Sequence, residues 1–337
     1  MPSLTITLPD AAFSGTKMLT AGAEASPFPR PSWRDAGTAA PRGHTDFAGA
    51  VGHAVQLMSA NDYGGEWYLP VDDGPHHLYV LERGTGPPVL AVHGGPGHDH
   101  GYLLDALAGI ESRHRVVYFD QRGSLRSPIP IDNVTFEAVV DDIPTLVGEL
   151  GGGPAPVVAH SMGCVVTAAA LARHPDLFSH VVLVNPGPLK SGQGMPPAAD
   201  ARPEVGEELA RAGISGRPRT AKEATWAWRI QFAGVNLFHV DRWRQVAGGR
   251  VFYKAEVAKA VWSTMPSDYD YVGSLRRHPY PVTIVVGDHD CVDPGARHAE
   301  GAAGGAVRTV VLPDAGHAAW IDQPERFREA VERGLGG

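Results

Sequence analysis

A serine with a distinctive local setting occurs in VVAHSMGC, residues 157–164. An apolar run precedes Ser161, small residues follow it as VVTAAALA, and Ala159 and Gly163 lie two positions to either side. A buried strand ending in an ordinary turn would account for the apolar run alone. Small residues on both sides are what a tight strand-to-helix turn needs when it exposes a nucleophile. The stretch therefore predicts a nucleophile elbow, with a helix N-terminus behind Ser161 to stabilise developing negative charge.

A serine hydroxyl reacts only with help from two further groups. A histidine must accept its proton, and a carboxylate must orient that histidine. His317 follows an apolar run and a glycine, and three aspartates, Asp288, Asp290 and Asp293, follow another apolar run. The order serine, aspartate, histidine along the chain is typical of α/β-hydrolases. The sequence therefore predicts a catalytic triad of Ser161, His317 and one of the three aspartates.

The elements that position these residues are short, Val-rich runs, each followed by glycines or polar residues. Such runs are typical of strands buried on both faces of a parallel sheet. These runs read PPVLAVHGG, HRVVYFDQRG, APVVAHSMG, SHVVLVNPG, PVTIVVGDHD and AVRTVVLPDAGH. Two further strands are expected before them, joined by a turn at Asp73-Gly74. Helical patterns alternate with the runs, so we predict an α/β fold with a mostly parallel, doubly wound sheet. The candidate residues then gather at the carboxyl edge of that sheet.

The alternation predicts three parts. Residues 1–65, rich in Ala, Gly, Pro and Ser, form an N-terminal extension with one helix over 45–60. Residues 66–187 and 280–337 form the sheet core, and residues 188–279 form an inserted helical cap. A single long helix is expected over 221–245, with Trp226, Ile230, Leu237 and Val240 along one side. Trp228, Phe232 and Val235 make a second apolar stripe. Two stripes suggest that Trp226 or Trp228 faces a substrate pocket, although packing within the cap explains them equally well.

Composition limits the classes of function. The chain has 337 residues, 43% of them hydrophobic, and a formal net charge of −8, which argues against general nucleic-acid binding. No apolar run approaches the about 20 residues of a membrane span, and the first residues lack a secretory signal pattern, so a cytoplasmic location is expected. The two cysteines, Cys164 and Cys291, are expected to be reduced. The histidines at 93, 98 and 100 are expected to be structural, with no metal or other cofactor.

Three motifs together resemble the proline iminopeptidase family of α/β-hydrolases. They are HGGPG at 93–97, DQRGSLRS at 120–127 and AHSMGC at 159–164, and the resemblance runs from about residue 66 onward. It implies an α/β-hydrolase fold with a helical cap. It also implies Asp290 as the acid, through the spacing G-x-x-D-x-x-x-P from Gly287. The oxyanion N–H groups would belong to Gly95 and Met162, with Gly94 a less favoured donor.

One position departs from the family pattern. Proline iminopeptidases recognise a free α-amino group with cap glutamates, one in a W-x-x-W-E segment, and the nearest segment here is TWAWRIQ, with Arg229 in the place of the glutamate. A cation there would repel an amine. Three hypotheses therefore stay open. The first is hydrolysis of an amide, ester or lactone with a small or apolar, optionally anionic, acyl group. The second is an aminopeptidase releasing a residue such as proline or alanine, and the third an acyltransferase or a non-catalytic binder. In each case the expected partner is a small molecule or short peptide, with no nucleic acid or membrane.

Overall fold

The computed structural model describes residues 65–72, 75–151, 153–193, 202–246 and 253–337. These residues belong to one compact unit, Val51–Gly337. The extension over 1–64, with the helix predicted over 45–60, lies outside the described residues, as does the Asp73-Gly74 turn. Among the helices of the described residues, none is long and apolar enough to cross a bilayer.

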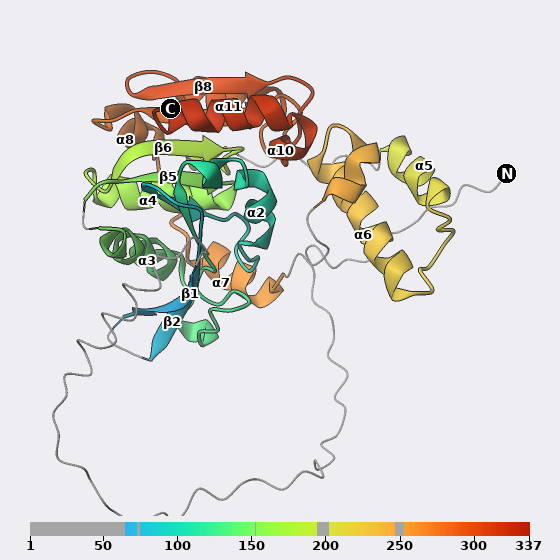
Figure 1. Ribbon diagram of the computed structural model, residues 1–337, viewed down its shortest axis with the longest axis horizontal. Coiled ribbons are helices and arrows are strands. Elements are labelled where there is room, and N and C mark those ends of the chain that lie inside the picture. The colour runs from blue at the N-terminus through green and yellow to red at the C-terminus, as the bar shows by residue number, and fades with distance from the viewer. Residues whose placement is uncertain (1–64, 73–74, 152, 194–201, 247–252) are drawn as a thin grey trace, which may run out of the picture. The chain divides into compact units, whose positions relative to one another are not determined.

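One eight-stranded sheet forms the centre of the molecule (Figure 1), with the strand order β1-β2-β4-β3-β5-β6-β7-β8. β1 and β2 are antiparallel neighbours, β2 is antiparallel to β4, and all further pairs are parallel. The strands are β1 (Glu66–Val71), β2 (His76–Arg83), β3 (Pro88–Val92), β4 (Arg115–Phe119), β5 (Ala155–His160), β6 (Phe178–Val184), β7 (Val282–Gly287) and β8 (Val307–Leu312). The predicted doubly wound, mostly parallel sheet is confirmed, because each Val-rich run forms a strand and the crossovers place helices on both faces.

Helices cover each face of the sheet. On one face pack α3 (Phe136–Glu149), α4 (Met162–Arg173), α7 (Ala255–Thr264), α8 (Val272–Arg277) and α9 (Arg297–Ala302). On the other face pack α2 (Gly101–Leu107), η1 (Ile110–Ser112), α10 (Ala319–Asp322) and α11 (Pro324–Gly334). Short 3₁₀ turns also occur at η2 (Ile131–Asn133) and η4 (Pro294–Ala296).

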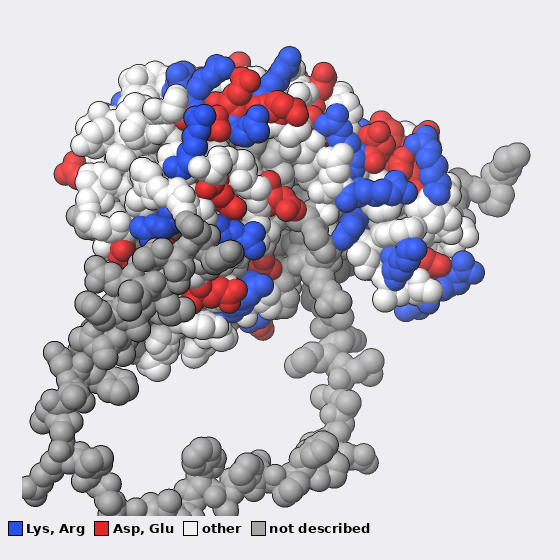
Figure 2. All heavy atoms as spheres, viewed as in Figure 1, with Lys and Arg blue, Asp and Glu red and all other residues white. Residues whose placement is uncertain are grey.

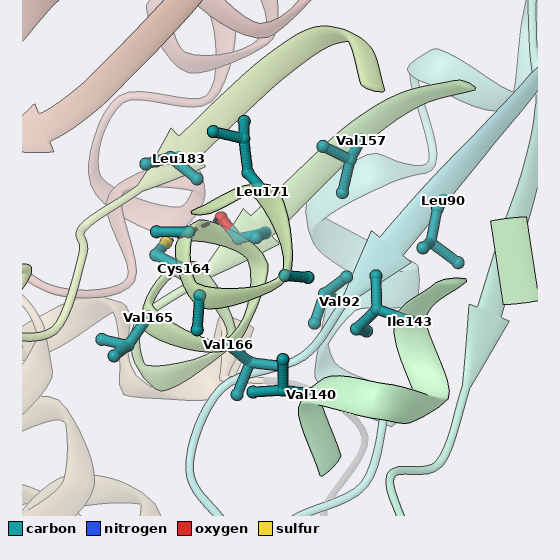
Figure 3. Packing of buried hydrophobic residues seen from close by; sticks show 14 of the residues in the cluster. Leu90, Val92, Val140, Ile143, Val157, Cys164, Val165, Val166, Leu171 and Leu183 are labelled. Atoms are coloured by element: carbon teal, nitrogen blue, oxygen red, sulfur yellow. Dashed lines mark hydrogen bonds between the residues drawn. The ribbon is translucent and has the colours of Figure 1, made fainter. Parts of the chain in front are cut away.

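The helix that follows the serine is almost entirely buried. Ten of the residues of α4, from Met162 to Leu171, are buried. Figure 3 shows the packing of this helix: Cys164, Val165, Val166 and Leu171 meet Val140 and Ile143 of α3 and Leu90, Val92, Val157 and Leu183 of the central strands. Small residues allow α4 to lie close to the sheet, so its N-terminus is held rigidly at the end of β5.

A separate apolar cluster holds the cap helices together. α5 (Pro203–Arg211), α6 (Ala221–Asn236) and η3 (Val240–Gln245) pack around Ile230, Ala233 and Trp243, and this cluster also takes in Ala318 and Ile321 near α10. We call α5, α6 and η3 the cap lobe. By contrast, Val257 and Val261 of α7 and Leu275 of α8 belong to the main core cluster, although both helices lie in the 188–279 range expected to form the cap.

The single helix predicted over 221–245 is wrong. α6 ends at Asn236, and Leu237 takes extended φ/ψ values of −117° and 147° before η3 begins. The backbone N–H groups of Phe238 and His239 donate to the carboxylate of Asp322, at 2.8 and 3.0 Å. A buried carboxylate from a distant part of the chain therefore replaces the helical acceptors at this point, while the apolar spacing continues across the break.

Candidate active site

Ser161 lies in the turn between β5 and α4, with φ 54° and ψ −121°. A non-glycine residue in such a conformation costs about 1–3 kcal/mol and persists only where its surroundings enforce it. Two hydrogen bonds enforce it here: the Ser161 N–H donates to Val184 O at 3.0 Å, and its carbonyl accepts from Gly187 N at 3.0 Å. A Cβ on Gly163 would lie 2.5 Å from His93 O, which explains the need for glycine two positions after the serine.

His317 and Asp290 lie together at the ends of β8 and β7. His317 Nδ1 is 2.7 Å from Asp290 Oδ1, and Asp290 is completely buried. An ionised carboxylate only accepts, so Nδ1 carries the proton and Nε2 keeps its lone pair. The Val292 N–H also donates to Oδ1, at 3.0 Å. The pair therefore presents a histidine in the tautomer that a general base requires.

The other two aspartates of the same loop have structural partners. Asp288 Oδ1 accepts from the Ala315 N–H at 3.3 Å and lies 2.7 Å from Nδ1 of the exposed His289. Asp293 accepts from the N–H groups of His298 and Ala299, at 3.0 and 2.8 Å, where α9 begins. Of the three, the structure therefore brings only Asp290 to His317.

The glycine loop after β3 lies against the elbow. A Cβ on Gly94 would come 2.6 Å from Ser161 Cβ, so only glycine fits at this approach. The Gly94 N–H donates to Tyr102 Oη at 2.5 Å, which leaves it engaged within the protein. Gly95 has a φ of 58°, and Met162 is the first residue of α4, whose N–H has no partner within the helix. The N–H groups of Gly95 and Met162 stay the predicted oxyanion donors, and the Gly94 N–H is already engaged.

A buried chain of hydrogen bonds passes through His160. It joins the glycine loop (residues 93–97) to the loop that carries His317 (residues 313–318), which we call the histidine loop. Tyr102 Oη lies 2.8 Å from His160 Nδ1, and His160 Nε2 lies 3.2 Å from His317 O. Because a carbonyl only accepts, Nε2 carries the proton of His160, and the Tyr102 hydroxyl donates to Nδ1. Burial, and then the neighbouring His317, hold the pKa of His160 well below its ordinary value. His160 therefore stays neutral and acts as a fixed spacer between the two loops.

Asn185 secures the same carbonyl from the neighbouring strand. It lies at the end of β6, is completely buried and has a φ of 44°. Its Nδ2 donates to Gly316 O at 2.8 Å and to His317 O at 2.6 Å, and its Oδ1 accepts from Gly287 N at 3.2 Å. One amide therefore ties the histidine loop to the end of β7, which carries Asp290.

Asp322 joins the histidine loop to the cap lobe. In addition to Phe238 and His239, its carboxylate accepts from the Gly316 N–H at 2.9 Å. The Ala318 N–H donates to Asn236 O at 3.0 Å, and a Cβ on Gly316 would lie 2.5 Å from that same carbonyl. The C-terminal end of α6 is therefore in contact with both neighbours of His317. Sequence reasoning missed Tyr102, Asn185 and Asp322, which lie in no recognised motif.

The motif residues around the glycine loop have structural partners. Asp120 lies 2.6 Å from His100 Nδ1 and accepts from the Arg126 N–H at 3.0 Å. Burial opposes its charge, but its contacts with His100 prevail and lower the pKa of Asp120 to about 2. His93 Nε2 accepts from the Gln121 N–H at 3.0 Å, and the His98 ring lies against Tyr253. These contacts fix the loop that carries Gly94 and Gly95.

Both cysteines are free thiols, as predicted. Burial raises the pKa of Cys164, which lies inside α4, well above its ordinary value. Cys291 has ligand-type atoms of Asp290 and His317 within 4.8 Å, the one grouping of this kind among the described residues. Burial and then Asp290 raise the pKa of Cys291 to about 12.

The three cap residues singled out from the sequence have different surroundings. Trp226 packs edge-to-face on Trp243, with ring centroids 5.7 Å apart, and so belongs to the interior of the cap lobe. Trp228 stacks on Phe232 at 5.2 Å and is 37% exposed. Arg229 is half-buried, and its Nε is a buried nitrogen with no hydrogen-bond partner among the described residues.

The sheet, the elbow and the histidine–aspartate pair at its carboxyl edge define an α/β hydrolase. The family model for the alpha/beta hydrolase fold matches residues 87–324, more than half of the chain, and the chain belongs to this family. The predicted fold class is thereby confirmed.

Individual relatives are hydrolases with different names. A 2-(acetamidomethylene)succinate hydrolase from Mesorhizobium japonicum is 31% identical over 139 residues, which are 41% of this chain and 49% of that protein. A proline iminopeptidase from Xylella fastidiosa is 36% identical over 122 residues, 34% of this chain and 37% of that protein. The chain thus matches about half or less of the length of these relatives.

Solved structures agree on the fold over a longer span. A proline iminopeptidase-related protein from Thermus thermophilus superposes with a TM-score of 0.58 at 28% identity, over 81% of this chain and 97% of that one. An E-2-(acetamidomethylene)succinate hydrolase superposes with a TM-score of 0.56 over 82% of this chain and 100% of that one, and its 21% identity shows the fold alone. The relatives include iminopeptidases and other hydrolases. The resemblance predicted from the motifs is therefore confirmed for the alpha/beta hydrolase family as a whole. It is not confirmed for the proline iminopeptidases in particular.

Proposed function

We propose that this chain is a serine hydrolase that cleaves an amide or ester of a small or apolar acyl group through an acyl-enzyme. The observation that carries the proposal is the 2.7 Å contact between His317 Nδ1 and the buried Asp290, on the sheet edge where Ser161 occupies its strained turn. A binding protein has no need of this combination. The proposed class is that of the family, whose relatives are named as hydrolases.

Each residue then has a defined role. His317 Nε2 takes the proton of Ser161 as its Oγ attacks the carbonyl carbon, and Asp290 stabilises the imidazolium that forms. The N–H groups of Gly95 and Met162 hold the oxyanion of the tetrahedral intermediate, with the N-terminus of α4 behind them. His317 returns the proton to the leaving amine or alcohol. Water, activated by the same histidine, then releases the acid and restores Ser161.

The substrate is proposed to be a small molecule or short peptide. On the face shown in Figure 2, acidic and basic side chains of the described residues are interspersed, without a continuous basic area of the kind that binds a phosphate backbone. No cofactor has a step in the proposed chemistry.

The test is covalent labelling combined with turnover. A fluorophosphonate probe should add to Ser161, as located by peptide mass spectrometry, and the protein should hydrolyse members of a panel of aryl esters and aminoacyl arylamides. Ser161→Ala should lose both properties while keeping its unfolding temperature. Absence of both labelling and turnover in the unchanged protein would refute the proposal.

An aminopeptidase that releases proline or alanine is the second candidate, favoured by the similarity to proline iminopeptidases. A comparison of kcat/KM for prolyl arylamide and its N-acetylated analogue separates the candidates. Efficient cleavage of the free amine with little cleavage of the blocked analogue would establish the aminopeptidase. Acyl transfer is recognised by products formed with added amines or alcohols.

A further inference from the structure

Two sides of helix α6 are covered by other parts of the cap lobe. A helix presents residues at spacings of three and four along one face. The face with Ile230, Ala233 and Leu237 lies in the cluster around Trp243, and Gly234 lies against Val205 of α5. These contacts account for two adjacent sides of the helix.

A third side of α6 faces solvent, since Val235 is 63% exposed and Trp228 is 37% exposed. The fourth side holds Thr225, Arg229, Phe232 and Asn236, at the spacings i, i+4, i+7 and i+11, and all four are half-buried. It is turned away from α5.

The fourth side ends at the catalytic histidine loop. Asn236, its last residue, accepts from the Ala318 N–H at 3.0 Å and lies against Gly316. Arg229 lies seven residues earlier, about 10 Å along the axis at 1.5 Å per residue. Phe232 lies between them, stacked on Trp228, and supplies an aromatic wall. The fourth side therefore runs from the loop that carries His317, past the ring of Phe232, to the cation of Arg229.

Arg229 differs from most arginines in and next to the cap lobe. Arg242 donates to the carbonyls of Ile321 and Asp322, and Arg244 lies over the Trp243 ring. Arg202, Arg211 and Arg219 each pair with a glutamate. Among the described residues, Arg229 has no carboxylate within ion-pair distance, and its buried Nε has no acceptor. A partly buried guanidinium without a carboxylate partner is costly, and a substrate carboxylate that contacts its terminal nitrogens supplies that partner.

We propose that Arg229 is an anion subsite, and that the preferred substrate carries a carboxylate separated from the scissile carbonyl by an apolar spacer lying along Phe232. This inference rests on the proposed hydrolase function for the position of the scissile bond. The cation makes a charge-assisted contact with the substrate and takes no part in bond breaking.

The kinetic experiment uses 4-nitrophenyl half-esters of succinate, adipate and suberate beside neutral 4-nitrophenyl alkanoates of matched length. The unchanged protein should prefer the carboxylates, and more strongly for the longer spacers. Arg229→Met should reduce kcat/KM for the suberate half-ester by about 10- to 100-fold, while leaving the matched neutral ester within about twofold. Arg229→Glu should reverse the preference toward ω-amino esters.

The matched control is Arg219→Met, which makes the same change of charge on an arginine that is 78% exposed and paired with Glu223. It should leave the preference unchanged. Equal effects of Arg229→Met on charged and neutral esters, or an equal effect of Arg219→Met on the carboxylate preference, would overturn the subsite.

Binding to a catalytically dead protein separates the two proposals. Suberate, measured by calorimetry on Ser161→Ala, should bind and should lose about tenfold or more in affinity when Arg229→Met is added. Arg229-dependent suberate binding without turnover or labelling of the unchanged protein would refute the hydrolase and keep the subsite. Turnover together with suberate binding that ignores Arg229 would refute the subsite and keep the hydrolase.

Discussion

The carboxyl edge of the sheet and the cap lobe hold their polar residues in opposite ways. At the edge, His317, Asp290, Asn185 and His160 are each fixed by hydrogen bonds from a second element of the core. In the cap lobe, Trp228 stacks on Phe232 of the same helix, and the Nε of Arg229 has no hydrogen-bond partner among the described residues. Hydrogen bonds from the core therefore hold the His317–Asp290 pair in one geometry. A substitution of Trp228 or Arg229 in the cap lobe leaves these hydrogen bonds in place. Under the two proposals above, the chemistry belongs to the sheet edge and the selectivity to the cap lobe.

The largest expected effect is that of Asp290→Asn. The amide can donate toward His317 Nδ1, which favours the wrong tautomer, so kcat should fall by about 10³- to 10⁴-fold. Steady-state kinetics on the best ester of the panel measures it, and the unfolding midpoint should change little. Asp288→Asn, on the same loop, is the control and should stay within a few-fold. A loss below tenfold for Asp290→Asn would mean that the edge tolerates change as the lobe does.

Asp322→Ala tests the connection between the two regions. It leaves three backbone N–H groups, those of Gly316, Phe238 and His239, without their acceptor. At about 1–3 kcal/mol for each unsatisfied buried group, the free energy of unfolding should fall by about 3 kcal/mol or more. Urea unfolding measures this, and kcat should fall as well because the histidine loop loses an anchor. Glu329→Ala, on an exposed ion pair of α11, should change stability by less than about 0.5 kcal/mol.

Asn185→Gly sharpens the distinction between positioning and folding. Glycine tolerates the φ of 44°, so the variant removes the amide without adding backbone strain. We expect kcat to fall by about 10- to 100-fold with KM within about twofold, because His317 loses its anchor and the cap lobe is untouched. A rise in KM at unchanged kcat would contradict a positioning role. Asn185→Asp should be worse than glycine, since a carboxylate would face two carbonyl oxygens.

The smallest expected effect is a pH dependence of stability. The folded-state pKa values of His160 and His93 lie below the unfolded value near 6.5, mainly because both rings are buried. Below pH 6.5 the unfolded chain binds protons that the folded chain excludes, so stability falls as pH falls toward the folded pKa values. Each histidine should contribute a loss of up to about 1 kcal/mol between pH 6.5 and 5.5, the limit reached when the folded ring binds no proton in that range. Urea unfolding of His160→Gln at both pH values should show a smaller loss, and an unchanged loss would show that His160 does not carry this effect.

The sequence predicted the parts whose cause is local. Each strand from β3 to β8 is a short Val-rich run. Ser161 could be recognised because a sharp turn needs Gly163. The end of α6 at Asn236 could not be predicted, because apolar residues continue at helical spacing and the acceptor that ends the helix, Asp322, lies 84 residues away from Phe238. Tyr102 and Asn185 were missed for the same reason. Their partners lie 58 and 132 residues away, and neither position has a sequence signature of its own.

The contact between Asp322 and the cap lobe has a consequence for how the protein is made. Domains form from the N-terminal side as the chain emerges from the ribosome. When Phe238 and His239 are translated, the carboxylate that receives their N–H groups is still to be synthesised. The lobe can therefore collapse around Trp243 early, but it cannot be fastened to the catalytic edge until Asp322 follows. Synthesis itself imposes an order in which the cap helices wait for the histidine loop.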